Sequence, residues 1–394
     1  MRLCCETLKY HDYLERFLDD KKVALFVDTD AIGGSREFAL VVLYEMVVGK
    51  GYKFFGSKLK AAARQFQEAV EAHKAKLAAE GITASGCAEE SVSEAIPRYV
   101  RVNTLVVSVD EVLENLQIDG WKVKTCNASN FATTFKSLGK RDVLRDPHVD
   151  DLLVFPTKTD LHAHPLVASG GFVLQDKASC LPAFVLAPKP GEIAFDACAA
   201  PGNKTSHMAA LMENKGKIYA CDLSDNRINT LHSTMKTTGT TIARVAQGDF
   251  LGVEPSEAKF ANLKYIIVDP PCSGSGIAKR ADFLSKERKS VDRNRLNKLH
   301  NLQVMLLRHA FKFPGVERIV YSTCSIHEEE NEDVVAEMLG TDDIYNNFQL
   351  VDPLSSWTHR GNDRYDFGDK VLRADPATDL TNGFFVALFA RRTD

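Results

Sequence analysis

The chain has 394 residues, of which 44% are hydrophobic and 26% are charged, and this composition excludes an intrinsically disordered protein. Its length fits two or three domains. No run approaches the roughly 18 apolar residues that a membrane helix needs, and the N-terminus lacks a signal-peptide pattern. Nine cysteines without a C-x-x-C pair argue against a disulfide framework and a structural zinc site. We therefore expect a soluble protein of a reducing compartment.

The charge is unevenly distributed along the chain. With 49 basic and 53 acidic side chains the net charge is −4, which does not indicate a class of binding partner. Residues 50–76 and 279–298 nevertheless each carry a local charge of +5, whereas residues 325–343 hold eight acids and no Lys or Arg. A charge run is usually a solvated face. Basic segments on a mildly acidic protein are also typical of an enzyme that binds a polyanion.

The first part of the chain predicts helices and then a small mixed module. Good helix formers dominate residues 36–80, with an interruption at Gly49–Gly51, and residues 81–96 resemble a polar linker. After Pro97, strand, helix and strand patterns follow at residues 98–107, 109–116 and 121–125. We expect a helical region over residues 1–96 and a small α+β module over residues 97–166.

The remaining residues, 167–394, predict a doubly wound α/β sheet, because apolar strands alternate with helical segments. The clearest strands are expected at residues 193–197, 217–221, 265–268, 318–321 and 384–390. Ligands of such sheets bind at the carboxyl ends of the strands.

A glycine turn and two carboxylates at consecutive strand ends predict a nucleoside-containing cofactor. The first strand runs into a tight turn at Gly202, which permits close approach of a ligand and is neither G-x-G-x-x-G nor a Walker A loop. Asp222 ends the next strand and can accept both hydroxyls of a ribose, with Arg227 at the start of the following helix. Asp249 ends a third strand and can accept from an adenine amine. Each acid alone could be a helix N-cap, but together they favour the cofactor.

Two cysteines follow two further strands. Asp269-Pro-Pro-Cys272 resembles the acid-Pro-Pro-aromatic motif of methyltransferases that act on exocyclic amines, with Cys in the aromatic position. Cys324 stands in Tyr321-Ser-Thr-Cys-Ser325 at the next strand end. C5 of cytosine becomes nucleophilic enough to accept a methyl group only after a thiolate adds to C6, and a base must then remove the C5 proton. The alternative reading is two buried small hydrophobic residues.

Five segments together resemble the Nop/Sun family of RNA cytosine-C5 methyltransferases, which use S-adenosylmethionine. They are residues 97–104, 174–180, 196–202, 269–276 and 321–324. Asn203 replaces the second glycine usual in the family. The motif with Asn203, together with residues 151–156 and 323–325, is similar to that of the fifth animal subfamily, which methylates large-subunit ribosomal RNA in the nucleolus. Residues 1–35 do not follow that subfamily's longer N-terminal region.

The resemblance implies roles for individual residues. Cys324 would attack the base and Cys272 would assist release. DNA cytosine methyltransferases use a cysteine where Cys272 stands, so the reverse order stays open. Lys204 would lie beside Asp269 and the target base. The implied cofactor site comprises Cys198, Ala199, Ala200, Pro201, Gly202, Asn203, Lys204, Asp222, Arg227 and Asp269, with Asp249 near the adenine.

The resemblance also implies the architecture and the partners. The fold would be a mostly parallel, seven-stranded, Rossmann-like methyltransferase sheet, preceded by an RNA-recognition-like α+β module and a helical N-terminal region. We expect a monomer that binds RNA, no metal and no membrane, in the nucleus and nucleolus. The alternatives are the same chemistry on tRNA or another RNA, and a catalytically silent RNA-binding scaffold of ribosome assembly. A DNA cytosine methyltransferase would carry a large target-recognition insert, and an amine methyltransferase needs no second cysteine.

Overall fold

A computed structural model describes residues 2–52, 55–84, 96–277 and 292–392. Their contacts divide them into two compact units, one before residue 93 and one after residue 94. The basic stretch at 279–298 lies mostly outside the described residues. Among the helices of the described ranges, none is both long enough and apolar enough to cross a membrane.

The first unit is helical, as expected. Tyr13, Phe17, Phe26 and Leu43 form part of its buried core. Its first three helices lie before residue 36, in a part of the expected helical region where the sequence pattern marked out no individual helix. The helices are α1 (Arg2–Lys9), α2 (His11–Leu18), α3 (Lys21–Ala24), α4 (Arg36–Val47) and α5 (Ser57–Ala79).

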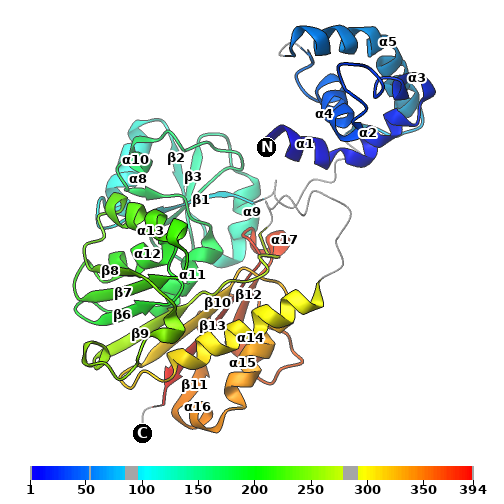
Figure 1. Cartoon of the computed structure of the whole chain (residues 1–394). Coiled ribbons are helices and arrows are strands. Elements are labelled where there is room, and N and C mark those ends of the chain that lie inside the picture. The colour runs from blue at the N-terminus through cyan, green and yellow to red at the C-terminus, as the bar shows by residue number, and fades with distance from the viewer. Residues whose placement is uncertain (1, 53–54, 85–95, 278–291, 393–394) are drawn as a thin grey trace. The chain divides into compact units, whose positions relative to one another are not determined.

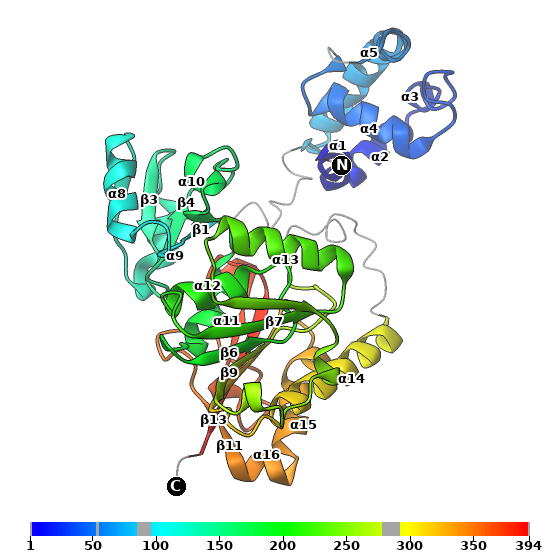
Figure 2. The same cartoon turned by 60° about the vertical axis from the view of Figure 1, so that its left-hand side comes forward.

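The second unit begins with the α+β module (Figure 2). Its sheet has five strands in the order β2-β3-β4-β1-β5. Its last strand lies beyond residue 166 and pairs with β1. The elements are β1 (Arg98–Val102), α8 (Val109–Ile118), β2 (Lys122–Lys124), η2 (Ala128–Asn130), α9 (Phe131–Lys136), β3 (Asp142–Arg145), β4 (Leu152–Phe155), α10 (Pro165–Ala168) and β5 (Phe172–Val173).

The large sheet has the order β11-β13-β10-β9-β6-β7-β8 (Figure 1). The five strands from β10 to β8 are parallel, and β13 is antiparallel to β10. This is the expected seven-stranded Rossmann-like order, with an additional strand, β12, paired to β13. The strands are β6 (Ile193–Asp196), β7 (Lys217–Asp222), β8 (Ala243–Gln247), β9 (Leu263–Val268), β10 (Arg318–Thr323), β11 (Phe348–Val351), β12 (Val371–Ala374) and β13 (Phe384–Arg391).

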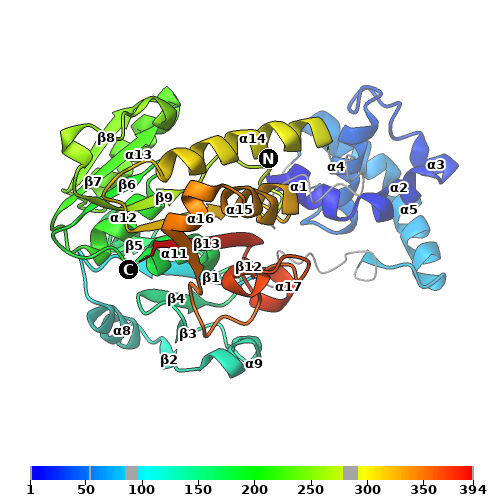
Figure 3. The same ribbon diagram turned by 90° about the horizontal axis from the view of Figure 1, so that it is seen from below.

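Helices pack against both faces of this sheet (Figure 3). Along each strand, side chains alternate between the two faces. Ala194, Ile267 and Val320 belong to one buried cluster, whereas their neighbours Phe195 and Ile266 belong to the other. The first face carries α11 (Lys177–Leu186), α12 (Asn203–Leu211) and α13 (Asp225–Thr237), and the second α14 (Arg293–Ala310), α15 (Glu332–Leu339) and α16 (Asp342–Asn347). Short helices complete the unit: η3 (Phe250–Gly252), η4 (Ala258–Phe260), η6 (Glu328–Glu330), η7 (Gly368–Lys370) and α17 (Pro376–Asp379).

Strand β1 of the module is bonded directly to the large domain. Arg101 is fully buried, and its guanidinium donates to Gln175 Oε1 and to Ser206 Oγ on α12, each at 2.8 Å. Tyr99 Oη donates to the carbonyl oxygen of Leu380 at 3.0 Å. The module is therefore fixed to the helix that starts at the cofactor turn predicted from the sequence.

Candidate active site

The turn between β6 and α12 begins the site. Gly202 has φ +106° and is the N-cap of α12. A Cβ at this position would lie 2.9 Å from side-chain atoms of Leu231 and Met235 on α13. The glycine therefore allows two helices to pack closely, and its expected role in the approach of a ligand stays a prediction. The N–H groups at the start of α12 are left without intrahelical partners by helix geometry.

Asp222 and Arg227 are bound to this turn. Asp222 is 4% exposed, and its carboxylate accepts from the N–H groups of Ala200 and Ser224, each at 3.1 Å. The Arg227 guanidinium lies 3.2 Å from Asp222 Oδ2 and also donates to the carbonyl oxygen of Ala200. The end of β7 thereby holds the turn in place.

Asp249 is exposed at the end of β8, and its Oδ1 accepts from the N–H of Leu251 at 2.9 Å. It caps η3, so the N-cap reading applies to this residue. The exposed carboxylate of Asp249 also lies at the carboxyl edge of the sheet. The strands β10, β9, β6, β7 and β8 are parallel, so all of them end at this edge.

A narrow pocket of about 50 Å³ brings seven of the predicted site residues together. The Lys204 ammonium lies 2.7 Å from Asp269 Oδ2, and the Ser322 hydroxyl donates to Asp269 Oδ1 at 2.7 Å. Burial lowers the pKa of Lys204, but the ion pair with Asp269 outweighs it, so that pKa is raised and the cation is maintained. The pocket is lined by Ser179, Asp196, Cys198, Ala199, Ala200, Pro201, Asn203, Lys204 and Asp269.

The two predicted cysteines meet beside this pocket. Their Sγ atoms are 3.0 Å apart, although 52 residues separate them in the chain. Cys272 follows β9 and Cys324 follows β10, which are neighbouring parallel strands. The N–H of Gly276 donates to the carbonyl oxygen of Cys324 at 2.9 Å, so the two loops are also joined through their backbones.

The hydrogen bond between the sulfurs separates their acidities. It lowers the pKa of Cys324 against the effect of burial, and the Lys204 ammonium favours the same thiolate. The same bond, together with burial, raises the pKa of Cys272. The contact therefore lets the Cys272 thiol donate to the Cys324 sulfur and favours the thiolate form of Cys324. A thiolate is the nucleophilic form of cysteine.

Sequence reasoning missed four residues of this site. Asp196 is 1% exposed at the end of β6, its Oδ2 accepts from the Thr205 hydroxyl at 2.7 Å, and burial raises its pKa to about 6. Leu223, next to Asp222, is 71% exposed. Ser322 orients Asp269, and the Phe384 ring lies 5.6 Å from Lys204 Nζ. The strand-end position of Asp196 was the available signal, since it matches that of Asp222.

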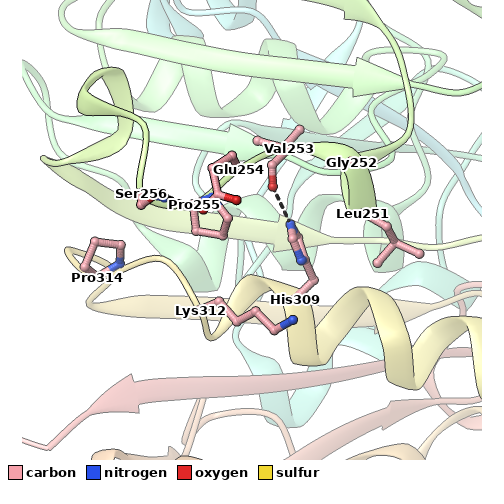
Figure 4. Close-up of a pocket in the computed structure, with 9 residues that line it drawn as sticks. All are labelled: Leu251, Gly252, Val253, Glu254, Pro255, Ser256, His309, Lys312 and Pro314. Carbon is pink, nitrogen blue, oxygen red and sulfur yellow. Dashed lines mark hydrogen bonds between the residues drawn. The ribbon is translucent and has the colours of Figure 1, made fainter.

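The larger cavity, of about 510 Å³, lies elsewhere (Figure 4). His309 Nε2 and the carbonyl oxygen of Val253 are 2.9 Å apart there, which ties the loop after η3 to the end of α14 (Figure 4). No cysteine and no predicted site residue lines it; its walls are Leu251, Gly252, Val253, Glu254, Pro255, Ser256, His309, Lys312 and Pro314.

The groups at the strand ends fit a nucleoside-bearing cofactor with a charged amine. Asp196, Asp222 and Asp249 are carboxylate acceptors at strand ends, and Leu223 is an exposed apolar side chain beside Asp222. The start of α12 supplies N–H donors for a carboxylate. Metal-ligating clusters of three or more His, Cys, Asp or Glu side chains do not occur among the described residues.

Three family models match consecutive parts of the chain. Residues 1–84 match the N-terminal domain of NOL1/NOP2/Sun domain family member 5, and residues 96–175 match the ferredoxin-like domain of that family member. Residues 183–390 match the 16S rRNA methyltransferase RsmB/F model. The first match corrects the expectation that residues 1–35 depart from the subfamily.

Individual proteins agree with the models. The chain is 43% identical to the 26S rRNA (cytosine-C(5))-methyltransferase nsun-5 of Caenorhabditis elegans, over 99% of this chain and 90% of that protein. It is 37% identical to the 28S rRNA (cytosine-C(5))-methyltransferase of Mus musculus, over 99% and 83%. The crystal structure of PH0851 superposes with a TM-score of 0.67 over 98% of this chain and 89% of that one, at 25% identity. The chain therefore belongs to the Nop/Sun family of RNA cytosine-C5 methyltransferases, within its fifth subfamily.

Proposed function

We propose that the protein methylates C5 of a cytosine in large-subunit ribosomal RNA, with Cys324 as nucleophile and Cys272 as the group that assists release. The cofactor of this family is S-adenosylmethionine. The observation that carries the catalytic assignment is the contact of the two sulfurs at 3.0 Å beside the Lys204–Asp269 pair. The worm and mouse relatives are named for 26S and 28S rRNA, which supports the large-subunit RNA as substrate.

The first step is addition of the Cys324 thiolate to C6 of the target cytosine. A C6–S bond forms, and the electron pair of the C5–C6 double bond moves into the ring, so that C5 becomes nucleophilic. Lys204 and Asp269 present a donor and an acceptor for the polar edge of the base. The base must leave any stack to reach both sulfurs. When bound, S-adenosylmethionine supplies an electrophilic methyl group, which C5 takes up.

The second step removes the C5 proton and restores aromaticity. Once its sulfur is bonded to C6, Cys324 is no longer an anion that accepts from Cys272. The main cause of the raised pKa of Cys272 is then removed, while burial still raises it, so Cys272 releases its proton to solvent more readily. The Cys272 thiolate accepts the C5 proton, the C5–C6 double bond reforms, and Cys324 leaves as a thiolate. This returns the pair to its starting state, with one net proton released.

The cofactor residues follow from the same geometry. Asp222 would bind the ribose hydroxyls, Asp249 the adenine amine, and Leu223 one face of the adenine. The turn from Cys198 to Asn203 and the carboxylate of Asp196 would hold the amino-acid end of the cofactor.

The α+β module carries a charge asymmetry suited to binding RNA. Residues 122–145 hold six bases against one acid, whereas residues 108–119, which include α8, hold four acids and no base. The exposed bases lie on β2, α9, β3 and the loop before β3: Lys122, Lys136, Lys140, Arg141 and Arg145. Their contacts with phosphates would position the RNA without reading its sequence.

We infer the oligomeric state from the site and the cellular location from the substrate. Both cysteines, Lys204 and Asp269 come from one chain, which supports action as a monomer. Large-subunit RNA is assembled with proteins in the nucleolus, and we place the enzyme there, in the nucleus.

Bisulfite sequencing of RNA from cells with and without the protein tests the proposal. One large-subunit cytosine should resist conversion only when the protein is present, and a Cys324→Ala variant should not restore that resistance. Loss of methylation at a tRNA instead would give the enzyme a different substrate. Unchanged methylation in all RNA would contradict the proposal.

A further inference from the structure

Two of the eight acids in the run at residues 325–343, Glu330 and Glu332, are buried rather than solvated. Glu330 and Asn331 are each 0% exposed, at the junction of η6 and α15. The backbone carbonyl of Glu330 accepts from the Tyr321 hydroxyl at 2.6 Å, which ties this junction to β10. Burial of a carboxylate is costly unless specific donors satisfy it, so its partners are informative.

The partners of Glu330 flank Cys272. Glu330 Oε1 accepts from the N–H of Ser273 at 2.8 Å and from Gln303 Nε2 at 3.0 Å. Gln303 Nε2 also donates to the carbonyl oxygen of Pro271 at 3.0 Å. The peptide groups of the residues before and after Cys272 are thus both held by one buried Glu–Gln pair.

The partners of Asn331 flank Cys324 in the same way. Asn331 Nδ2 donates to the carbonyl oxygen of Ser325 at 2.9 Å, and Asn331 Oδ1 accepts from the Thr323 hydroxyl. Thr323 Oγ1 in turn accepts from the N–H of Ser325 at 3.2 Å. One side chain therefore holds the residues on both sides of Cys324.

We propose that Glu330 and Asn331 are positioning residues that set the separation of the two catalytic sulfurs. Because they are adjacent in the chain, a single peptide unit links the clamp on the Cys272 loop to the clamp on the Cys324 loop. Displacements of about 1 Å can cost roughly a hundredfold in rate when reacting groups must be aligned. The inference rests on the roles given to the two cysteines in the proposed function.

The two clamps act on different steps, which distinguishes positioning from general stability. Glu330→Met removes the acceptor for Ser273, so Cys272 should shift away from Cys324. Attack should slow about tenfold, and the covalent RNA adduct should persist because release is impaired. Glu330→Gln keeps an acceptor oxygen of the same reach and should rescue both effects. Asn331→Asp places an acceptor against the Ser325 carbonyl, so adduct formation should fall at least tenfold.

The matched control is Glu332→Met. Glu332 is also 0% exposed in the same acidic run, but it accepts from Arg373 Nε at 2.7 Å and from the N–H of Asn362, neither of which is a residue adjacent to Cys272 or Cys324. Its loss should lower thermal stability and leave the thiol chemistry unchanged. If Glu330→Met does not fold, Gln303→Met, which removes the donor to Pro271, should give the same signature.

The measurements are the pH profile of Cys324 alkylation by iodoacetamide, adduct formation and decay, and affinity for S-adenosylmethionine. We expect an upward-shifted alkylation profile for Glu330→Met, near wild-type behaviour for Glu330→Gln and Glu332→Met, and cofactor affinity within about twofold throughout. Wild-type alkylation and turnover in folded Glu330→Met, or an equal shift in Glu332→Met, would overturn the proposal. Alkylation needs no RNA, so it tests the positioning of the sulfurs separately from the proposed function. Failure of the wild-type enzyme to methylate RNA would refute the proposed function, whereas the alkylation profiles would still test the positioning role.

Discussion

The thiol of Cys272 should control the acidity of Cys324, and removing it gives a quantitative test. In Cys272→Ala the donor to the Cys324 thiolate is lost, while the Lys204 ammonium remains. The pKa of Cys324 is lowered in the wild type mainly by this hydrogen bond, so it should rise in the variant. Cys272→Ser retains a hydroxyl donor at the same position and serves as the control.

The size of the shift follows from the donor. Hydrogen bonds to charged groups contribute about 1.5–3 kcal/mol, and a thiol is a weak donor, so we take the lower end of that range. One pKa unit corresponds to about 1.4 kcal/mol, so the pKa of Cys324 should rise by about one unit. At a pH below the Cys324 pKa of both proteins, the variant should hold about one tenth of the wild-type thiolate fraction. Its alkylation near neutral pH should therefore be about tenfold slower than that of the wild type. Well above both values the rates should converge.

The assay is alkylation of Cys324 by iodoacetamide across neutral and alkaline pH, followed by mass spectrometry of its peptide. An upward shift for Cys272→Ala, with little change for Cys272→Ser, is the expected result. An unchanged profile in Cys272→Ala would refute the coupling. An equal shift in the serine variant would assign the effect to packing instead of the hydrogen bond.

Three further results are expected. Asp222→Ala should weaken S-adenosylmethionine binding about tenfold or more by calorimetry, and unchanged affinity would remove Asp222 from the site. Arg101→Met deletes two buried hydrogen bonds from a charged donor and should lower the free energy of unfolding by about 3 kcal/mol in denaturant titrations. Lys122→Met, at an exposed position, should change it by less than about 0.5 kcal/mol. Equal losses in the two variants would contradict a stabilising role of the buried Arg101 hydrogen bonds. Lys136→Glu with Arg141→Glu should weaken RNA binding and reduce the slope of log K against log salt by about 0.7 per lost phosphate contact, and an unaltered slope would mark that surface as merely solvated.

Patterns local in sequence predicted the sheet and most of the chemistry. Apolar runs that end in Asp222, Asp269 or Cys324 are visible without any tertiary information, and parallel pairing then gathers their ends at one edge. The module strands β3 to β5 and the strands β11 and β12 have two to four residues each and were not anticipated. Such short segments give too few alternating positions for a period to stand out.

Residues whose role depends on distant partners could not be predicted. Glu330 looks like part of a solvated acidic run, and only its bonds to Ser273 and Gln303, which are distant in the chain, explain its burial. A glycine between a strand and a helix is typical of a ligand-binding turn. At Gly202, however, the atoms that leave no room for a Cβ belong to α13, which the local sequence does not reveal. Asp196 has the same strand-end position as Asp222, but its burial and its bond to the Thr205 hydroxyl depend on the folded turn.

The measurement that tests the account most directly is covalent trapping of RNA by the two cysteine variants on a denaturing gel. If Cys324 attacks C6 and Cys272 serves release, Cys272→Ala should accumulate a slow-migrating, nuclease-sensitive band. Cys324→Ala and the double variant should lack that band, because attack precedes release. A band with Cys324→Ala instead would reverse the two roles. If neither variant traps RNA while both retain methylation activity, covalent catalysis by this pair would be contradicted.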